Sequence, residues 1–386
     1  MAAFACVAVL ALAACGSSSD DDGSSTGAAS GAGADSGSTS GSSDPSNKSI
    51  VVFTPATSNN YVAMWTAAAK DTLERAGYEP RFYENNFDQS EEDQQVQQVI
   101  ASGDRPAGFI WWPSDNPAGI ASVRRLSQIA PVVQTNNKVL PEAQRYVKAF
   151  GGVNDYADGV ATGRLALRMR DAFRAAGLRF HSPEGNALIV TYVPGYQAGI
   201  DRVRGIEDAT RDDPFNVVGT VVTRFTSEES YRDVSQALPG LKDRGIDFVI
   251  AVSEFPAIGA IKALRESGLT PGRDVGVVTG NCQTNFDLIN SGAEYGTILQ
   301  SPSIEGQTAA QVLAKVLENG GRTTGTDTEY TLPADPDTVP ELPAELAYYN
   351  YMPLPAIEAG KSPAENKRIV AESRLWGQTA DELCAR

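Results

Sequence analysis

A short polar stretch, residues 54–61, offers the first side chains in the chain that could bind a ligand. Its sequence TPATSNNY carries hydroxyl and amide groups, which donate and accept hydrogen bonds without a formal charge. Such groups suit a neutral, polyhydroxylated ligand. The same composition is typical of an ordinary polar loop between a strand and a helix, so for this loop alone both interpretations stay open.

Signals for catalysis and metal binding are weak. His181 is the single histidine and no CxxC pair occurs, which disfavours a zinc site and a Ser-His-acid triad. The Gly-Lys-Ser of residues 360–362 lacks a P-loop glycine, because Pro355 stands at that position. No G-x-G-x-x-G follows a strand, so a dinucleotide site is unsupported. We expect no enzyme, no cofactor and no metal. A secreted enzyme that uses Glu254 as acid or base is the less favoured alternative.

The amino-terminal segment predicts export and anchoring. Residues 1–14, MAAFACVAVLALAA, have the apolar run and small residues of a secretory signal, and the run is too short to span a membrane. Leu12 to Cys15 resembles the lipobox of bacterial lipoproteins, which makes Cys15 the lipidated residue. No Lys or Arg precedes the run, so we expect the true start to lie upstream of Met1. Residues 15–47, with the lipidated Cys15, read as a disordered Ser/Gly tether of roughly 30 Å.

Charge and cysteine content narrow the possible partners and the possible disulfides. The 48 acidic residues outnumber the 32 basic ones, giving a net charge of −16. This balance argues against nucleic acid and against electrostatic membrane binding. Beyond Cys6 and Cys15, only Cys282 and Cys384 remain, and they form a disulfide or stay as two free thiols.

The elements that must position the polar loops alternate between strands and helices. Residues 50–53 form an apolar, β-branched strand, and a helix follows from Tyr61 with Val62, Trp65, Ala69 and Leu73 on one face. Further strands are expected at 109–112, 131–134, 187–193, 217–222, 248–252, 275–279 and 297–299. Helices between them are expected at 91–102, 116–129, 155–176, 231–244, 257–267 and 304–318. This alternation predicts parallel sheets with right-handed crossovers, in two lobes with a cleft between them.

With these elements in place, the chain resembles the type I periplasmic, or ribose-type, sugar-binding proteins of ABC importers over about residues 48–331. SNNYVAMW resembles that family's first ligand loop, PVVQTNN its following strand and loop, and GGVNDYADG its first interlobe crossing. GIDRVRGIEDA, AVSEFPAIGAIKAL, VVTGNCQ and GTILQSP follow in the family's order. The resemblance implies two doubly wound lobes joined by a hinge of three crossings.

The resemblance also implies a set of lobe boundaries. The first lobe is expected at 48–153 and 301–325, the second at 154–300 and 326–338, and a carboxyl-terminal extension at 339–386. The crossings are expected near 150–155, 300–303 and 320–330.

The motif positions imply a ligand-binding set carried over residue by residue. It comprises Asn59, Tyr61, Asn136, Asn137, Arg202, Ser253, Glu254, Asn281 and Gln300. Several positions depart from the family, since Asn-Asn replaces Asp-Arg, Ser-Glu replaces Asn-Asp and Asn281 replaces an aspartate. An amide can make only part of the hydrogen bonds of a carboxylate, so ribose itself is not the expected ligand.

Two residues in the expected cleft carry alternatives. Arg202 either donates its guanidinium fork to ligand oxygens or forms a surface ion pair with Asp201 or Glu207. Trp111 and Trp112 end one strand, so alternation sends them to opposite faces and at most one can stack on a sugar ring. We include Trp112 in the expected ligand set.

These expectations lead to one functional hypothesis. The chain is expected to be a monomeric, lipid-anchored, extracytoplasmic receptor that captures a sugar or polyol and delivers it to an ABC permease. A sensor that presents its bound solute to a membrane signalling protein is the alternative. No nucleic acid is expected as a partner.

Cys15→Ala should leave the chain without a lipid and its folded part unchanged. Fractionation of cells grown with a labelled fatty acid checks this. A lipid signal of unaltered strength in the variant would contradict it.

Overall fold

The computed structural model describes residues 47–282, 286–331 and 342–358. The expected signal, Cys15, Cys384 and nearly all of the tether lie outside the described residues. None of the helices in these ranges combines the length and apolar composition of a membrane span.

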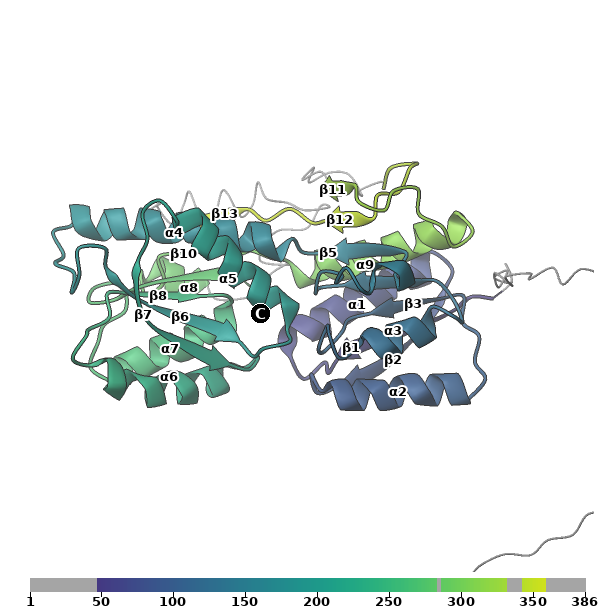
Figure 1. The fold of residues 1–386 in the computed structure, drawn as a ribbon, viewed down its shortest axis with the longest axis horizontal. Coiled ribbons are helices and arrows are strands. Elements are labelled where there is room, and N and C mark those ends of the chain that lie inside the picture. The colour runs from purple at the N-terminus through teal and green to yellow at the C-terminus, as the bar shows by residue number, and fades with distance from the viewer. Residues whose placement is uncertain (1–46, 283–285, 332–341, 359–386) are drawn as a thin grey trace, which may run out of the picture. The chain divides into compact units, whose positions relative to one another are not determined.

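Two sheets form the centres of two lobes (Figure 1). The first sheet is parallel throughout, in the order β11-β12-β5-β4-β3-β1-β2. Its strands are β1 (Ser49–Pro55), β2 (Glu79–Asn85), β3 (Gly108–Trp111), β4 (Val132–Thr135), β5 (Ala149–Gly152), β11 (Glu329–Thr331) and β12 (Tyr349–Tyr351).

The second sheet has the order β13-β10-β9-β8-β6-β7, and only β13 among its described strands runs antiparallel to its neighbour. Its strands are β6 (Asn186–Tyr192), β7 (Asn216–Thr223), β8 (Phe248–Ala251), β9 (Gly276–Cys282), β10 (Gly296–Leu299) and β13 (Ala356–Glu358). The predicted pair of parallel α/β lobes is thereby confirmed.

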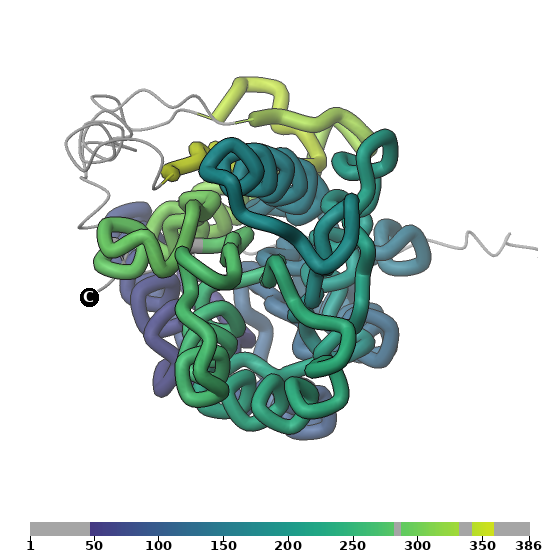
Figure 2. The backbone as a smooth tube through the Cα atoms, turned by 90° about the vertical axis from the view of Figure 1, so that its left-hand side faces the viewer, coloured from purple at the N-terminus to yellow at the C-terminus, as the bar shows by residue number. Residues whose placement is uncertain are grey.

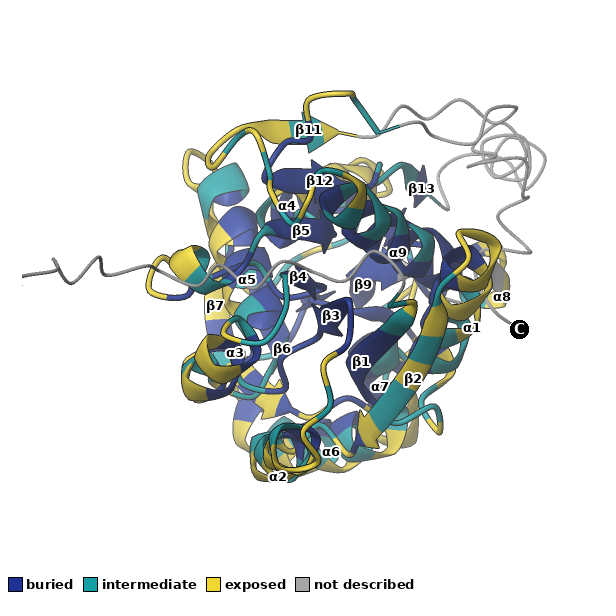
Figure 3. Ribbon diagram, turned by 90° about the vertical axis from the view of Figure 1, so that its right-hand side faces the viewer, coloured by how far each residue is buried: buried dark blue, intermediate teal, exposed yellow. Residues whose placement is uncertain are grey.

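The first sheet is apolar on both faces because helices cover both faces. Ile50 and Val52 of β1 face α1 (Asn60–Arg75) and α9 (Pro302–Glu318), whereas Val51 and Phe53 face α2 (Gln89–Ala101) and α3 (Ile120–Leu126). Figure 3 shows β1, β3 and β4 buried between helices whose outer faces are exposed. This packing fixes the polar loops that follow the strands at one edge of the sheet.

The second sheet is covered in the same way (Figures 1 and 2). Helices α4 (Asp155–Ala175) and α5 (Gln197–Thr210) pack on one face, and α6 (Ser227–Leu241) and α7 (Glu254–Glu266) on the other. The remaining short elements are α8 (Phe286–Asn290) and the 3₁₀ turn Gln144–Tyr146.

Three segments connect the lobes, and one of them lies at a different place in the chain than predicted. The crossings between β5 and α4 and between β10 and α9 lie where they were expected. The third was expected near 320–330 and lies at 352–355 instead, between β12 and β13. Each crossing, or the residues next to it, contributes one residue to a small separate core. These residues are Val153, Ile304 and Met352.

The expected boundaries near the carboxyl terminus are wrong for the same reason. Residues 326–338 were assigned to the second lobe, but β11 pairs in the first sheet. Residues 339–386 were expected to pack on the lobes as an extension, yet β12 lies within the first sheet, between β5 and β11, and β13 extends the second. The βα alternation ends after α9, but the sheets do not, because short strands of three residues complete them.

Close packing of α4 against α5 depends on glycine at the contact. A Cβ on Gly205 would lie 2.3 Å from the carbonyl oxygen of Tyr156 and 2.7 Å from the backbone nitrogen of Val160. The two helices could not approach this closely with any side chain there.

Gly205→Ala should lower the free energy of unfolding by about 1–3 kcal/mol, because the helices must move apart. Gly240 in α6 is the matched control, since a Cβ there meets no heavy atom within 4 Å. Gly240→Ala should instead raise stability by about 0.5–1 kcal/mol. Urea unfolding of the two variants checks this, and equal effects would contradict the packing argument.

Candidate functional site

A small cavity lies between the two lobes, at the carboxyl ends of the strands of both sheets. This is the position where open parallel sheets bind ligands. The lining residues are Asn59, Tyr61, Val62, Phe87, Trp112 and Asn136 from the first lobe, and Tyr192, Tyr196, Arg202, Phe225, Phe255 and Asn281 from the second.

Six residues of the expected ligand set are brought together in this lining. They are Asn59, Tyr61, Trp112, Asn136, Arg202 and Asn281. Their role as ligand contacts stays a prediction. Of the two tryptophans, Trp112 lines the cavity, whereas the Trp111 indole lies on the other face of the strand and donates to Glu92.

The other four expected residues lie outside the lining. Gln300 is buried next to it and bonds to three of its side chains. Asn137 accepts from the backbone N–H of Ala198 (2.8 Å), across the lobes. Ser253 and Glu254, at the start of α7, are both buried and do not line the cavity.

The first polar loop contributes to the cavity lining and begins a helix, and its role in ligand binding stays a prediction. Asn59 lines the cavity and also caps α1, because its Oδ1 accepts from the backbone N–H groups of Tyr61 (3.0 Å) and Val62 (3.4 Å). Thr54 is buried within β1 instead of lying in a loop.

Tyr61 is at the centre of a buried chain of hydrogen bonds. Its hydroxyl donates to Glu305 Oε2 and accepts from Gln300 Nε2, both at 2.6 Å. Glu305 also accepts from Asn136 Nδ2 at 3.2 Å, and Asn136 Oδ1 accepts from the hydroxyl of Tyr196 at 2.8 Å. The chain joins both lobes, since Tyr61 and Asn136 belong to the first and Tyr196 to the second.

Asn136 has a backbone conformation that explains the residue type. Its φ is 61°, in the left-handed region, which asparagine tolerates better than most residues. This turn directly after β4 presents the amide to both Glu305 and Tyr196.

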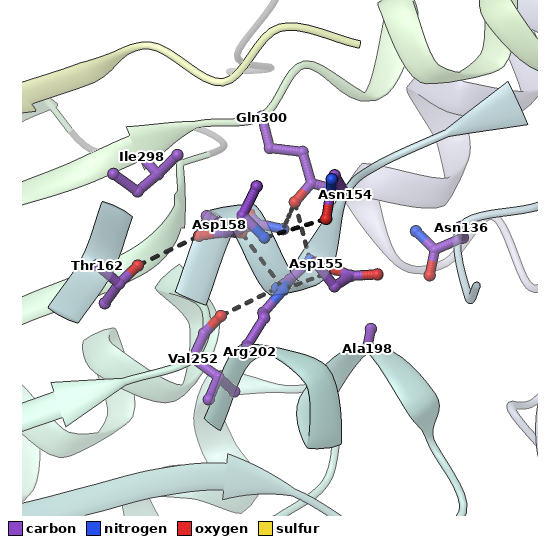
Figure 4. Close-up of polar contacts among 12 residues, drawn as sticks. Asn136, Asn154, Asp155, Asp158, Thr162, Ala198, Arg202, Val252, Ile298 and Gln300 are labelled. Atoms are coloured by element: carbon purple, nitrogen blue, oxygen red, sulfur yellow. Dashed lines mark hydrogen bonds and ion pairs between the residues drawn. The ribbon is translucent and has the colours of Figure 1, made fainter. Parts of the chain in front are cut away.

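Arg202 is held by its own lobe (Figure 4). Its Nε and Nη2 contact Asp155 Oδ1 at 2.9 and 2.7 Å, and its Nε lies 3.3 Å from Asp158 Oδ2. Nη1 donates to the carbonyl oxygen of Val252 and Nη2 to Gln300 Oε1, each at 2.9 Å. The alternative of a surface pair with Asp201 or Glu207 is wrong, because the guanidinium is only 3% exposed and pairs with α4.

The charges around Arg202 are unbalanced toward the negative. Asp155 and Asp158 occupy the first turn of α4, where the helix dipole favours an acidic residue. Burial raises the pKa of Asp155 to about 6 and that of Asp158 to about 7, although Arg202 lowers both. Burial likewise raises the pKa of Glu305 to about 7, against the hydrogen bonds from Tyr61 and Asn136.

Sequence reasoning missed several residues of the site. Glu305 resembles an ordinary acidic residue in the first turn of a helix, so nothing in its local sequence indicated a buried role. Phe87, Tyr192, Tyr196 and Phe225 are aromatic residues at the ends of strands or just beyond them. Such residues could have been found by looking for large apolar side chains in loops where polar ones are expected.

Comparison with known proteins places this geometry in a family. Residues 50–322 match the periplasmic binding protein domain. The chain belongs to the periplasmic binding protein family. The resemblance predicted from the motifs is confirmed, and the chain is a member of a family of extracytoplasmic solute-binding proteins.

The curated relative described next shares low sequence identity with the chain. The chain is 27% identical over 185 residues to a xylitol-binding protein of Mycolicibacterium smegmatis, covering 47% of this chain and 49% of that protein. The match thus spans about half the length of this relative.

Solved structures share the fold at low identity. A Mycobacterium smegmatis protein in complex with β-D-fucofuranose aligns with a TM-score of 0.66 at 17% identity, over 83% of this chain and 93% of that one. A Caulobacter myo-inositol binding protein aligns with a TM-score of 0.64 at 17% identity, over 84% and 96%. The periplasmic component of an arabinose ABC transporter from Shewanella sp. ANA-3 aligns with a TM-score of 0.64 at 16% identity, over 83% and 95%.

Arg202→Ala should lower the free energy of unfolding by about 3–5 kcal/mol, because it leaves Asp155 and Asp158 buried without their cation. Arg204→Ala is the matched control on the same helix. Its side chain is 59% exposed, pairs with Asp201 and lies 4.9 Å from the centroid of the Tyr156 ring, so the loss should be about 1 kcal/mol. Denaturant unfolding of both variants checks this, and equal losses would show that the buried pair contributes little.

Stability should fall between pH 5 and pH 8, in part through Glu305. Its folded pKa of about 7 lies above the ordinary 4.5, so its contribution is complete below about pH 4.5 and is lost as the pH rises through about 7. Glu305→Gln should reduce the loss of unfolding free energy between pH 5 and pH 8 by on the order of 2 kcal/mol.

Unfolding at both pH values measures this change. Glu318→Gln, an exposed substitution on the same helix, should leave the pH profile as in the wild type. A profile of Glu305→Gln that matches the wild type would show that Glu305 titrates normally in the folded protein.

Proposed function

We propose that this chain is a lipid-anchored receptor that captures a small, neutral, polyhydroxylated solute, a pentitol or a monosaccharide, and delivers it to an ABC permease. One observation carries the ligand class: the only basic side chain among the described lining residues, Arg202, is already neutralised by Asp155 and Asp158. An anionic solute therefore finds no free cation among the described residues that line the cavity.

The rest of the lining suits sugar chemistry. Asn59, Asn136 and Asn281 bring amides, and Tyr61, Tyr192 and Tyr196 bring hydroxyls, so the polar groups are uncharged donors and acceptors. The aromatic rings of Trp112, Phe87, Phe225 and Phe255 offer apolar surface to the C–H groups of a polyol. The xylitol-binding relative and the sugar and inositol complexes of the same fold support this class.

Trp112 adds a specific donor. It is 2% exposed, and its indole N–H lies near the Tyr196 hydroxyl but makes no well-aligned hydrogen bond among the described residues. A buried donor without a partner is costly, and a ligand hydroxyl in the cavity removes that cost.

Entry to the cavity requires the lobes to separate. Tyr61, Trp112, Asn136, Arg202 and Asn281 line the cavity but are each 5% exposed or less. We therefore include hinge motion about the three crossings in the proposed mechanism. Release to a permease then follows from the same opening.

A receptor role is favoured over catalysis by the position of Glu254. This residue, the acid or base of the alternative hypothesis, is buried at the start of α7 and does not line the cavity. Anchoring through Cys15 and the permease as partner complete the proposal.

Xylitol should bind and xylonate, the corresponding acid, should not. A thermal-shift comparison of the two solutes tests the proposal. A neutral solute at 100 times its dissociation constant should stabilise the fold by about 2.7 kcal/mol. Equal stabilisation by xylonate would contradict the argument from Arg202, and the absence of any shift across pentitols and monosaccharides would overturn the ligand class.

Trp112→Phe should weaken binding of the solute found in that screen by about 2- to 12-fold, the worth of one hydrogen bond. Trp65→Phe is the matched control. It also removes a buried indole N–H without an acceptor, and Trp65 packs against Trp112 with ring centroids 5.5 Å apart, but it does not line the cavity. Calorimetry should show reduced affinity only for Trp112→Phe. Equal affinities of both variants would show that the Trp112 N–H does not contact the ligand.

A further inference from the structure

An aromatic cluster joins the two lobes at the rim of the cavity. Phe87 from the first lobe stacks on Phe225 from the second, with ring centroids 4.2 Å apart and planes 21° from parallel. Tyr196 packs edge-on against both rings, at 6.4 Å from Phe87 and 4.7 Å from Phe225. Tyr192 lies 5.0 Å from Phe225. Phe87 is thus a single first-lobe ring inserted among three rings of the second lobe.

The backbone at Phe87 is in a conformation that bulky residues avoid. Its φ is 54°, in the left-handed region, where a phenylalanine is strained. Contacts on both sides hold it there. The backbone N–H and the side-chain amide of Asn86 donate to Glu91 Oε2 at 2.9 and 3.1 Å, and Asp88 Oδ1 accepts from the N–H groups of Ser90 and Glu91. The loop thereby aims the ring across the cleft instead of relaxing.

The sheet order places this contact far from the hinge. Phe87 follows β2, the edge of the first sheet, and four strand spacings separate β2 from β5, the strand before the first crossing. At about 4.8 Å per spacing the separation is roughly 19 Å. Phe225 follows β7, at the edge of the second sheet opposite to β13 and β10. In Figure 1, β2 lies well below β5 and β12.

We propose that Phe87 and Phe225 form an aromatic latch that holds the lobes closed and must open before a solute can enter. Because the pair is far from the crossings, a small rotation about the hinge separates these two rings more than the groups near Gln300. Both rings line the cavity, so the latch also forms part of its wall. The hydrogen bonds of Asn86 and Asp88 keep the loop in this conformation, so the ring is already positioned to stack when the lobes close.

The latch can be tested without any ligand, so its failure leaves the proposed ligand class untouched. Nitroxide labels at Gln97→Cys on α2 and Gln236→Cys on α6, both exposed positions, report the distance between lobes by pulsed electron resonance. The full chain is used, with its four native cysteines replaced by serine. Phe87→Ala and Phe225→Ala should each lower the ratio of closed to open molecules by about 2- to 12-fold, the worth of one aromatic pair.

Three further variants make the outcome decisive. The double variant should fall no further than either single one, because the pair acts together. Phe87→Gly should open the lobes while keeping or raising the melting temperature, since glycine relieves the left-handed strain. Tyr83→Ala, which removes a ring that packs against Phe53 within the first lobe, should keep the wild-type distances.

Several results would overturn the latch. They are a wild type that is wholly open, Phe87 and Phe225 variants with wild-type distances, and additive shifts in the double variant. A lower melting temperature of Phe87→Ala with unchanged distances would make Phe87 a structural residue of its own lobe.

Discussion

The burial of the Arg202 guanidinium between two aspartates is the constraint on which the site depends. A cation without partners could not remain in this interior, and a pair of carboxylates without the cation could not either. Asp155 and Asp158 belong to the first turn of α4, Arg202 to α5, and Gln300 to the crossing between β10 and α9. The contacts therefore fix two helices of the second lobe against a crossing between the lobes.

From Gln300 the polar network continues into the first lobe. Its amide N–H reaches Tyr61, and Tyr61 reaches Glu305 on α9, which packs on the first sheet. Gln300 and Tyr61 each donate and accept, so displacing either of them leaves another group buried without a partner. The bonds from Tyr196 to Asn136 and from Ala198 to Asn137 also join the two lobes, and they can be exchanged for solvent when the lobes separate.

The fold followed from the sequence where side-chain periodicity was strong. The buried strand at 50–53 and the helices beginning near Tyr61 and Asp155 carry patterns that only one type of element explains. The strand β2 was missed because it is an edge strand. It begins with Glu79, Pro80 and Arg81, so its sequence lacks the alternation of apolar and polar residues that indicates a half-buried strand. The strand β5 was missed because two of its four residues are glycine.

Residues of the site could be predicted where a polar side chain stands at a motif position at the end of a strand. Asn136 and Asn281 were found through motif positions at strand ends, and both line the cavity. The pairing of Arg202 with α4 could not be read from the sequence, because Asp155 lies 47 positions away and local acidic residues offered nearer candidates. Burial, which decides between a surface pair and a buried one, is a property of the packed lobes and not of any single segment.

The late position of β12 has a consequence for how the protein folds. Residues 155–299 supply five of the six described strands of the second sheet without interruption, so that lobe can gather nearly all of its core from one continuous stretch. The first lobe cannot, because α9 covers one face of its sheet and β12 lies between β5 and β11. Strand β5 ends at Gly152 and its neighbour β12 begins at Tyr349, so about 200 further residues must be synthesised before the two can pair. This order implies slow, long-range closure and a transiently exposed apolar face. The lobe that begins first therefore gathers most of its core after the second lobe has gathered its own.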